Sequence, residues 1–236
     1  MKSIEAHSPE NSPIQKPSFI KMMLDPKDQL LLLEKHSPLM FPLIKIILLI
    51  MTFGFIAGYY LSNNQETNTI AEEIGSTPAR YQVVSGLISG ISSVVGLLFS
   101  ILIITILYKI ALVAIRKDIP FKQIFVIGIY ISFIPFIGSI INFVVSIFMG
   151  EAEIREFTNF GNSLSSSNML TGVVSSFDVF KIWNVILYGM LFYYVAKCSK
   201  KQSFLISIIS FLLLMSLNVA AIYLGNLTSS LEIDLE

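Results

Sequence analysis

The sequence predicts an all-α, polytopic integral membrane protein: a bundle of five transmembrane helices with a short N-terminal interfacial helix. Three observations predict this class: an apolar composition, five long apolar segments, and a one-sided distribution of lysine and arginine. Hydrophobic residues make up 54% of the 236-residue chain and charged residues 14%, and the mean hydropathy is +0.73. Soluble domains are about 45–50% apolar and about 25% charged. Much of this protein's surface is therefore expected to face lipid.

Five segments are apolar enough to cross a bilayer, whose hydrocarbon core needs a helix of about 20 mostly apolar residues. The second segment is long, so we expect it to tilt or to emerge into water. The third contains Pro135, which we expect to kink one continuous helix, because two halves of about a dozen residues could not each cross. The predicted spans are residues 43–61, 84–115, 124–149, 179–196 and 204–225.

The segments outside the spans divide by composition. Residues 1–16 are polar and lack periodicity, so we expect a disordered cytoplasmic tail. An amphipathic helix is predicted from about Pro26 to Lys35, with Asp25 as its cap. That helix lies either in the membrane interface or on the cytoplasmic end of the bundle. The membrane domain then covers residues 17–225, with a mobile Ser/Gly/Asn-rich loop at 158–176 and an acidic external tail at 226–236.

The positions of the basic residues predict which side of the membrane each connecting segment occupies. One set of alternate segments holds twelve lysines and arginines, whereas the other holds only Arg80, Arg155 and Lys181. Because cytoplasmic loops are enriched in basic residues, we expect a cytoplasmic N-terminus and an extracytoplasmic C-terminus, as an odd number of spans also requires. The twelve are Lys2, Lys16, Lys21, Lys27, Lys35, Lys109, Arg116, Lys117, Lys122, Lys197, Lys200 and Lys201.

Small and polar residues recur along one face of the second and third spans, at steps of three and four residues. Residues at this spacing share a helix face, and small side chains there let two backbones approach closely. We favour helix packing over the alternative, a polar conduit for a small solute. The candidate packing or partner contacts are Ser89 and Gly96 in the second span and Gly128, Ser132, Pro135, Ser139 and Asn142 in the third.

Several function classes lack the residues that they need. The 16 basic and 16 acidic residues balance, which argues against a nucleic-acid partner. The one cysteine, Cys198, excludes a cysteine-based zinc cluster. The two histidines, His7 and His36, both lie outside the predicted spans, so the membrane segments lack the residues for metal-assisted or histidine-based catalysis. No nucleotide-binding GxxxxGK[ST] motif is present. We therefore expect no metal, no cofactor and no enzymatic activity.

The stretch "FDVFKIWNVILYG" opens the fourth span with four chemically distinctive residues: Asp178, Lys181, Trp183 and Asn184. Asp178 and Lys181 share a helix face, and Asn184 continues it one turn deeper. Lys181 is expected to reach lipid headgroups or to pair with Asp178, and indoles favour this depth. A catalytic Asp–Lys pair is the alternative, but it has no histidine or nucleophile nearby. The stretch is interpreted as an anchor and partner contact.

Four stretches together resemble the Yip family of small five-span membrane proteins. "FDVFKIWNVILYGM" looks like the family's fourth-span signature, and "FKQIFVIGIYISFIPFIGSIIN" looks like its third span. "FIKMMLDPKDQLLLLEKHSPLMFPLI" is similar to its N-terminal segment, and "AKCSKKQSFLISIISF" to the basic turn before the last span. Eukaryotic members carry a "DLYGP"-like motif linked to Rab GTPases. This chain has none, so Rab binding is not expected.

The resemblance implies a bacterial inner-membrane protein of the Yip type, a non-catalytic adaptor that assembles with or regulates another membrane complex. Some bacterial members are thought to accompany ABC exporters, so the resemblance favours an exporter for efflux or for resistance to antimicrobial peptides or toxins. The expected partners are the lipid bilayer and either other membrane proteins or further copies of this chain. The alternative is a small-solute transporter or channel that acts as an oligomer.

Overall fold

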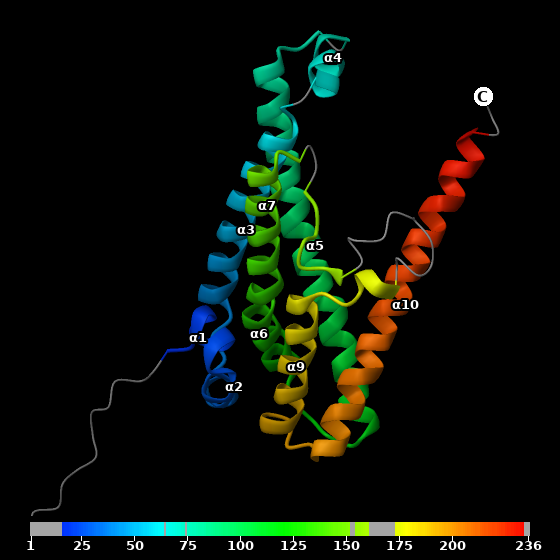
Figure 1. The fold of residues 1–236 in the computed structure, drawn as a ribbon. Helices are drawn as coiled ribbons and strands as arrows, with labels where there is room; N and C mark the ends of the chain where they lie inside the picture. Colours follow the sequence, from blue (N-terminus) through cyan, green and yellow to red (C-terminus); the bar gives the residue numbers. More distant parts are fainter. Residues whose placement is uncertain (1–15, 64, 74, 152–153, 161–172, 234–236) are drawn as a thin grey trace, which may run out of the picture.

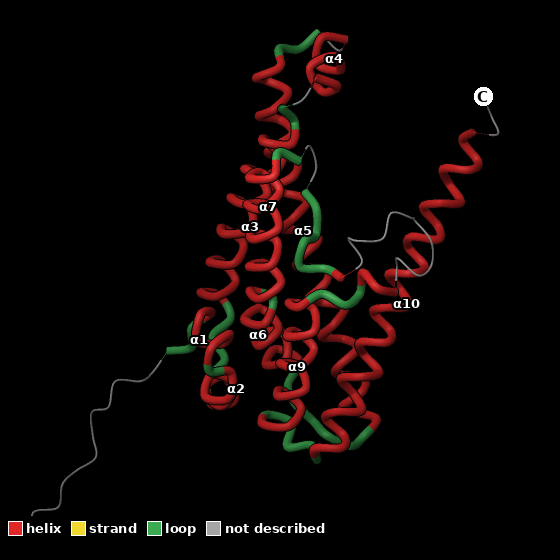
Figure 2. Tube along the Cα trace, viewed as in Figure 1, coloured by secondary structure: helices red, strands yellow, loops and turns green. Residues whose placement is uncertain are grey.

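The structure is a computed structural model, and it describes residues 16–63, 65–73, 75–151, 154–160 and 173–233. These residues form a helical bundle, and Figure 2 shows no strand among them (Figures 1 and 2). The tail predicted to be disordered, apart from Lys16, and most of the loop predicted to be mobile lie outside the described residues. The helices are α1 (Phe19–Leu24), α2 (Pro26–Lys35), α3 (Met40–Leu61), α4 (Gln65–Glu73), α5 (Pro78–Ala114), α6 (Phe121–Ile131), α7 (Phe133–Met149), α9 (Val179–Tyr194) and α10 (Lys200–Ile233).

Within the described residues, three helical stretches are long and apolar enough to cross a membrane: Met40–Leu61, Pro78–Ala114 and Phe121–Met149, the last of which joins α6 and α7. The 16 residues of α9 form a shorter apolar helix, about 24 Å long at 1.5 Å per residue. Helix α10 extends beyond the predicted span at both ends, to Lys200 and Ile233. The chain is thus an all-α, multi-pass membrane protein. Its count of five spans remains a prediction.

The third predicted span is interrupted at Ser132, where α6 ends and α7 begins. Pro135 has no N–H to donate to the carbonyl of Ile131, four residues earlier, so the ladder of backbone hydrogen bonds is incomplete there. The hydroxyl of Ser132 turns back and donates to the carbonyl of Ile129 at 2.8 Å. Instead of the expected kink at Pro135 in one continuous helix, the structure has a short break at Ser132, three residues before the proline.

Helix α2 has the predicted bounds, and it packs on the bundle. Pro26 is its first residue, and Asp25 occupies the cap position without making a side-chain capping bond. Leu30 and Leu33 are fully buried, and the side-chain amide of Gln123 on α6 donates to the carbonyl of Glu34 at 2.9 Å. Of the two placements left open by the sequence, α2 has the one on the end of the bundle.

The main hydrophobic core lies at this same end, where several helices contribute fully buried aliphatic side chains. Leu33 of α2, Leu112 of α5, Ile127 of α6 and Leu191 of α9 all have 0% exposure. The rings of Tyr108 and Tyr188 pack against each other in the same cluster, tilted by 49° and with their centroids 4.6 Å apart. This core joins the amphipathic N-terminal segment to the membrane helices.

Helices α3 and α5 lie side by side and approach closely because glycines face each other (Figure 1). A Cβ at Gly58 would lie 2.4 Å from the Cβ of Ser89, and a Cβ at Gly54 would lie 2.9 Å from the Cα of Gly90. Atoms this close would clash, so a side chain at either glycine would push the helices apart. Small residues therefore set the distance between α3 and α5.

Candidate functional site

Asp178, the acidic residue at the start of the fourth predicted span, caps α9. Its Oδ1 accepts hydrogen bonds from the backbone N–H groups of Phe180 at 2.8 Å and Lys181 at 2.9 Å. Its Oδ2 accepts a hydrogen bond from the hydroxyl of Thr158. The residue is only 5% exposed. Both carboxylate oxygens therefore have structural partners, as an N-cap aspartate requires.

Asn142 on α7 holds the other side of the same junction. Its amide nitrogen donates to the hydroxyl of Thr158 at 3.0 Å, and its amide oxygen accepts from the backbone N–H of Thr158 at 3.1 Å. One turn further along, the Ser146 hydroxyl accepts from the N–H of Arg155 at 2.9 Å. These side chains tie the segment 154–160 to α7 and to the start of α9. We call this set, Asn142, Ser146, Thr158 and Asp178, the polar junction.

Of the two partners expected for Lys181, lipid headgroups or Asp178, the second is wrong. The amine of Lys181 instead lies 3.3 Å from a carboxylate oxygen of Glu156, and it also donates to the carbonyl of Ser175 at 3.5 Å. The Asp178 carboxylate is occupied by the two N–H groups and by Thr158, so Lys181 points to the neighbouring segment. The side chains of Lys181 and Glu156 are 45% and 54% exposed, and such ion pairs contribute about 0–1 kcal/mol.

Trp183 and Asn184 lie in two different environments. Trp183 is partly buried and packs against the main core. Asn184 lines a separate cavity of about 350 Å³, together with Ser100 of α5, Pro135 of α7 and Lys181. The predicted shared face of Lys181 and Asn184 is thus real, and it looks into this cavity.

The predicted small-residue stripes are correct in part. Gly128 packs closely, since a Cβ there would lie 3.1 Å from Ile101 and 3.4 Å from the Tyr188 hydroxyl. Ser132 is 7% exposed, and Ser89 contacts α3. Gly96 and Ser139 do not pack against another helix in the described part of the chain, so for them only the alternative of a partner contact stays a prediction.

Gly96 and Ser139 lie away from the other helices for a geometric reason. No described atom beyond its own helix backbone and chain neighbours lies within 4 Å of a Cβ built at Gly96. Ser139 is exposed, and its hydroxyl donates to the carbonyl of Pro135 within its own helix at 3.2 Å. A stripe with alternating steps of three and four drifts by about 20° per seven residues around a straight helix. The break at Ser132 further separates Ser139 from the face of Gly128.

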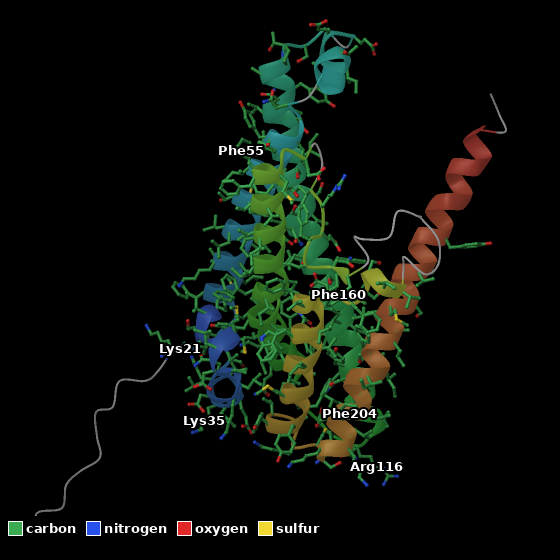
Figure 3. The ribbon with its side chains drawn as sticks, viewed as in Figure 1. Lys21, Lys35, Phe55, Arg116, Phe160 and Phe204 are labelled. Atoms are coloured by element: carbon green, nitrogen blue, oxygen red, sulfur yellow. The ribbon has the colours of Figure 1, made fainter. Side chains whose placement is uncertain are left out.

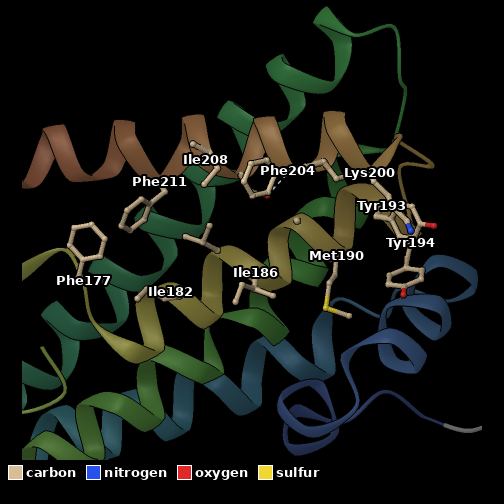
Figure 4. Close-up of a pocket in the computed structure, with 14 residues that line it drawn as sticks. Phe177, Ile182, Ile186, Met190, Tyr193, Tyr194, Lys200, Phe204, Ile208 and Phe211 are labelled. Carbon is tan, nitrogen blue, oxygen red and sulfur yellow. Dashed lines mark hydrogen bonds between the residues drawn. The ribbon is translucent and has the colours of Figure 1, made fainter. Parts of the chain in front are cut away.

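An apolar groove between α9 and α10 is a feature that the sequence analysis did not identify (Figure 4). It encloses about 530 Å³ and is lined mostly by large apolar and aromatic side chains. Ser203 lines it as well, and its buried Oγ has no hydrogen-bond partner in the described residues. Leaving such a hydroxyl unpaired costs about 1–3 kcal/mol. The hydropathy of the sequence indicates that α10 is apolar, but it does not indicate how closely α10 packs against α9.

The turn between α9 and α10 contains Cys198, which is 4% exposed. Burial raises the pKa of its thiol, and the nearby charge of Lys117 partly opposes this shift. The same turn is tied to α2 by the ion pair between Lys197 and Glu34, whose closest N–O distance is 2.9 Å. Among the described residues, no group of three or more His, Cys, Asp and Glu side chains could hold a metal ion.

The arrangement of the helices defines a multi-pass helical membrane protein. Its short apolar helix α9 is held by hydrogen bonds of Asp178 at one end and by the Lys197–Glu34 ion pair just beyond the other. Residues 20–222 match the Yip1 domain. The chain therefore belongs to the Yip1-domain family of membrane proteins. It is 20% identical over 202 residues to the membrane protein YknW of Bacillus subtilis (strain 168), an alignment that covers 84% of this chain and 86% of that protein. No solved structure matches the chain.

Proposed function

We propose that the protein is a non-catalytic adaptor of the bacterial inner membrane that assembles with or regulates an ABC-type exporter for efflux or for resistance to antimicrobial peptides or toxins. The observation that carries the non-catalytic part is the bonding of Asp178. Both of its oxygens accept hydrogen bonds from α9 and Thr158, and the amine of Lys181 is paired with Glu156. Asp178 and Lys181, the two charged residues at the start of the fourth predicted span, therefore have structural roles.

The exporter is the partner that the family resemblance implies, and the lipid-facing side of α5 offers a surface for it. Ile88, Val95 and Phe99 on this helix are each 60–62% exposed. Gly96 lies on the same stretch with open space at its Cβ position. A small residue beside exposed apolar side chains is a place where a helix of another protein can approach closely.

The proposed orientation places the α2 end in the cytoplasm. Figure 3 shows Lys35 and Arg116 at this end of the bundle, and the ion pairs Lys109–Asp118 and Lys197–Glu34 also lie there. The positive-inside rule supports the assignment.

In a Cys198→Ser background, Phe160→Cys should react with an impermeant maleimide on intact cells and Lys201→Cys should not. The reverse labelling pattern would overturn the orientation.

Affinity purification of the tagged, full-length protein from native membranes in a mild detergent tests the adaptor function. The permease and ATPase subunits of one ABC exporter should be recovered with it. Gly96→Leu should lower their recovery without lowering the thermal stability of the protein, because the position is open within the chain. Val95→Leu, a conservative change at an exposed neighbouring position, is the matched control.

The same experiment separates the adaptor from an enzyme. Asp178→Asn keeps the ability to cap a helix and removes the charge. An adaptor should retain resistance whenever the exporter complex is recovered. Normal recovery of the complex with total loss of resistance in Asp178→Asn would overturn the adaptor function.

The second candidate function is a small-solute channel or transporter that acts as an oligomer. The cavity lined by Ser100, Lys181 and Asn184 is the observation that favours it. Solute flux into vesicles that contain the purified protein, abolished by Asn184→Leu, would support this alternative. Absence of flux together with recovery of the exporter would leave the adaptor function.

A further inference from the structure

The α9–α10 groove is mostly apolar, and the charged residue Lys200 lies at one of its ends. Figure 4 shows Phe177 and Phe211 at one end and Lys200, Tyr193 and Tyr194 at the other. Its volume of about 530 Å³ lies within the usual range of ligand pockets, about 300–1,000 Å³. The two helices meet where a Cβ at Gly189 would lie 2.8 Å from the Ser207 hydroxyl. Bulky side chains border this contact and leave the groove beside it.

The polar end of the groove carries unpaired positive charge. Lys200 lines the groove, and both Lys200 and Lys201 are exposed. Neither lysine has an ion-pair partner among the described residues, since Glu34, a carboxylate at this end, is paired with Lys197. Ser203, one turn further into α10, adds a buried hydroxyl without a partner. An anionic group that also offers hydrogen-bond acceptors fits these three residues.

The lining favours an acyl chain over a helix of another protein. Close helix packing in membranes uses small residues, whereas Ile186, Phe204 and Ile208 border this groove and are 44%, 69% and 37% exposed. A flexible chain can follow the irregular surface between such side chains. The basic and aromatic end lies where headgroups would be, since tyrosine and lysine are favoured at membrane interfaces.

We propose that the α9–α10 groove binds one acyl chain of an anionic phospholipid, with the lipid phosphate at Lys200 and Lys201. The Ser203 hydroxyl donates a hydrogen bond to an ester oxygen of the same lipid. The occupant fills the space that the two helices leave open and pairs the hydroxyl that the chain leaves unpaired. This inference goes beyond the proposed adaptor function and does not depend on it.

Native mass spectrometry of the full-length protein in detergent, with phosphatidylglycerol or phosphatidylcholine of identical acyl chains, tests the headgroup. Phosphatidylglycerol should bind more tightly, and Lys200→Gln should weaken its binding about fivefold, the contribution of one lysine near an anionic membrane surface. Lys122→Gln removes an equivalent exposed charge from α6 and should have little effect. Equal binding of the two lipids, or equal effects of the two variants, would overturn the anionic site.

A second pair of variants tests the groove itself. Ile186→Trp fills the groove and should lower the binding of both lipids, whereas Leu48→Trp places the same side chain on an exposed part of α3 and should not. Phe204→Ala removes a side chain that lines the groove, and it should also weaken lipid binding. Because Phe204 is 69% exposed, the change should leave the packing of the core unaffected. Unchanged lipid binding in Ile186→Trp and Phe204→Ala would overturn the proposal. A change of oligomeric mass in these variants with normal lipid binding would overturn it too and identify a protein interface.

Discussion

The helix pairs α3–α5 and α9–α10 meet in opposite ways. In α3–α5, glycine faces serine or glycine so closely that a Cβ at Gly58 would lie 2.4 Å from that of Ser89. In α9–α10, the close approach at Gly189 is to the Ser207 hydroxyl, which is the end of a side chain, and a groove of about 530 Å³ lies beside it. The backbones of α3 and α5 are thus in close contact, whereas α9 and α10 leave space between them for a bound molecule.

The difference shows what holds helices together where water is absent. Lipid tails are as apolar as leucine, so apolar side chains alone do not drive two membrane helices together, and close packing of small residues does. Helix α9 packs one face in the main core and is also held by polar contacts at its ends. Asp178 bonds Thr158 at one end, and Lys197 pairs with Glu34 just beyond the other.

The largest expected effect comes from breaking the tight pair. Gly58→Leu places a side chain into the side chain of Ser89 and the backbone carbonyl of Ser85, and overfilled packing costs about 1–3 kcal/mol, occasionally more. We expect a loss of about 3 kcal/mol, measured as a lower thermal midpoint in mild detergent. Gly96→Leu, at an open position of α5, is the control and should leave the midpoint unchanged or raise it. Equal losses in both variants would mean that α3–α5 is not the tighter interface.

Ser132→Leu and Ser139→Leu sharpen the comparison within one predicted stripe. Ser132 is 7% exposed, so a leucine there should cost about 2 kcal/mol by overpacking. Ser139 is exposed, and a leucine there faces lipid and should be neutral or stabilising. Thermal unfolding of the two variants under the same conditions measures the contrast. An unchanged midpoint for Ser132→Leu would place that side of the helix against lipid or an open cavity.

Removing the cap of α9 tests whether polar contacts replace close packing in the loose pair. Asp178→Ala loses both capping bonds and the bond to Thr158, so we expect a loss of about 1–2 kcal/mol. Asp178→Asn should lose less, because asparagine also caps helices. Denaturation in mixed micelles measures both values. Equal losses for alanine and asparagine would show that the charge, and not the capping geometry, holds α9.

The smallest effect concerns Cys198, in the turn of the loose pair. Burial raises the pKa of its thiol, so the reactive thiolate is scarce near neutral pH. Labelling by a maleimide in the folded protein should be slow and should quicken as the pH rises. Because the folded state holds the proton more tightly, this thiol lowers stability as the pH rises above about 8.5, the pKa of a free cysteine. Fast labelling at pH 7 would show that the turn opens readily.

Local signals were enough to predict several elements. The bounds of α2 follow from Pro26, whose fixed φ suits the first helical position. The expectation of a kink at Pro135 follows from one missing N–H, and the close packing of Gly128 from a small residue in an apolar run. Gly96 and Ser139 do not pack against another helix of the described chain, because sequence spacing gives a shared face but not the neighbour that the face meets. A partner contact at these positions stays a prediction.

By itself, the sequence determined that this protein is an all-α membrane protein and where α2 begins, because hydropathy and proline geometry act over one or two helical turns. It predicted a kink at Pro135 in one continuous helix, but not the break at Ser132. Only the tertiary structure decided that Lys181 pairs with Glu156, that Asn142 binds Thr158, and that a groove remains between α9 and α10. These outcomes depend on which helices become neighbours. That choice is made by packing across the bundle, between residues far apart in the chain.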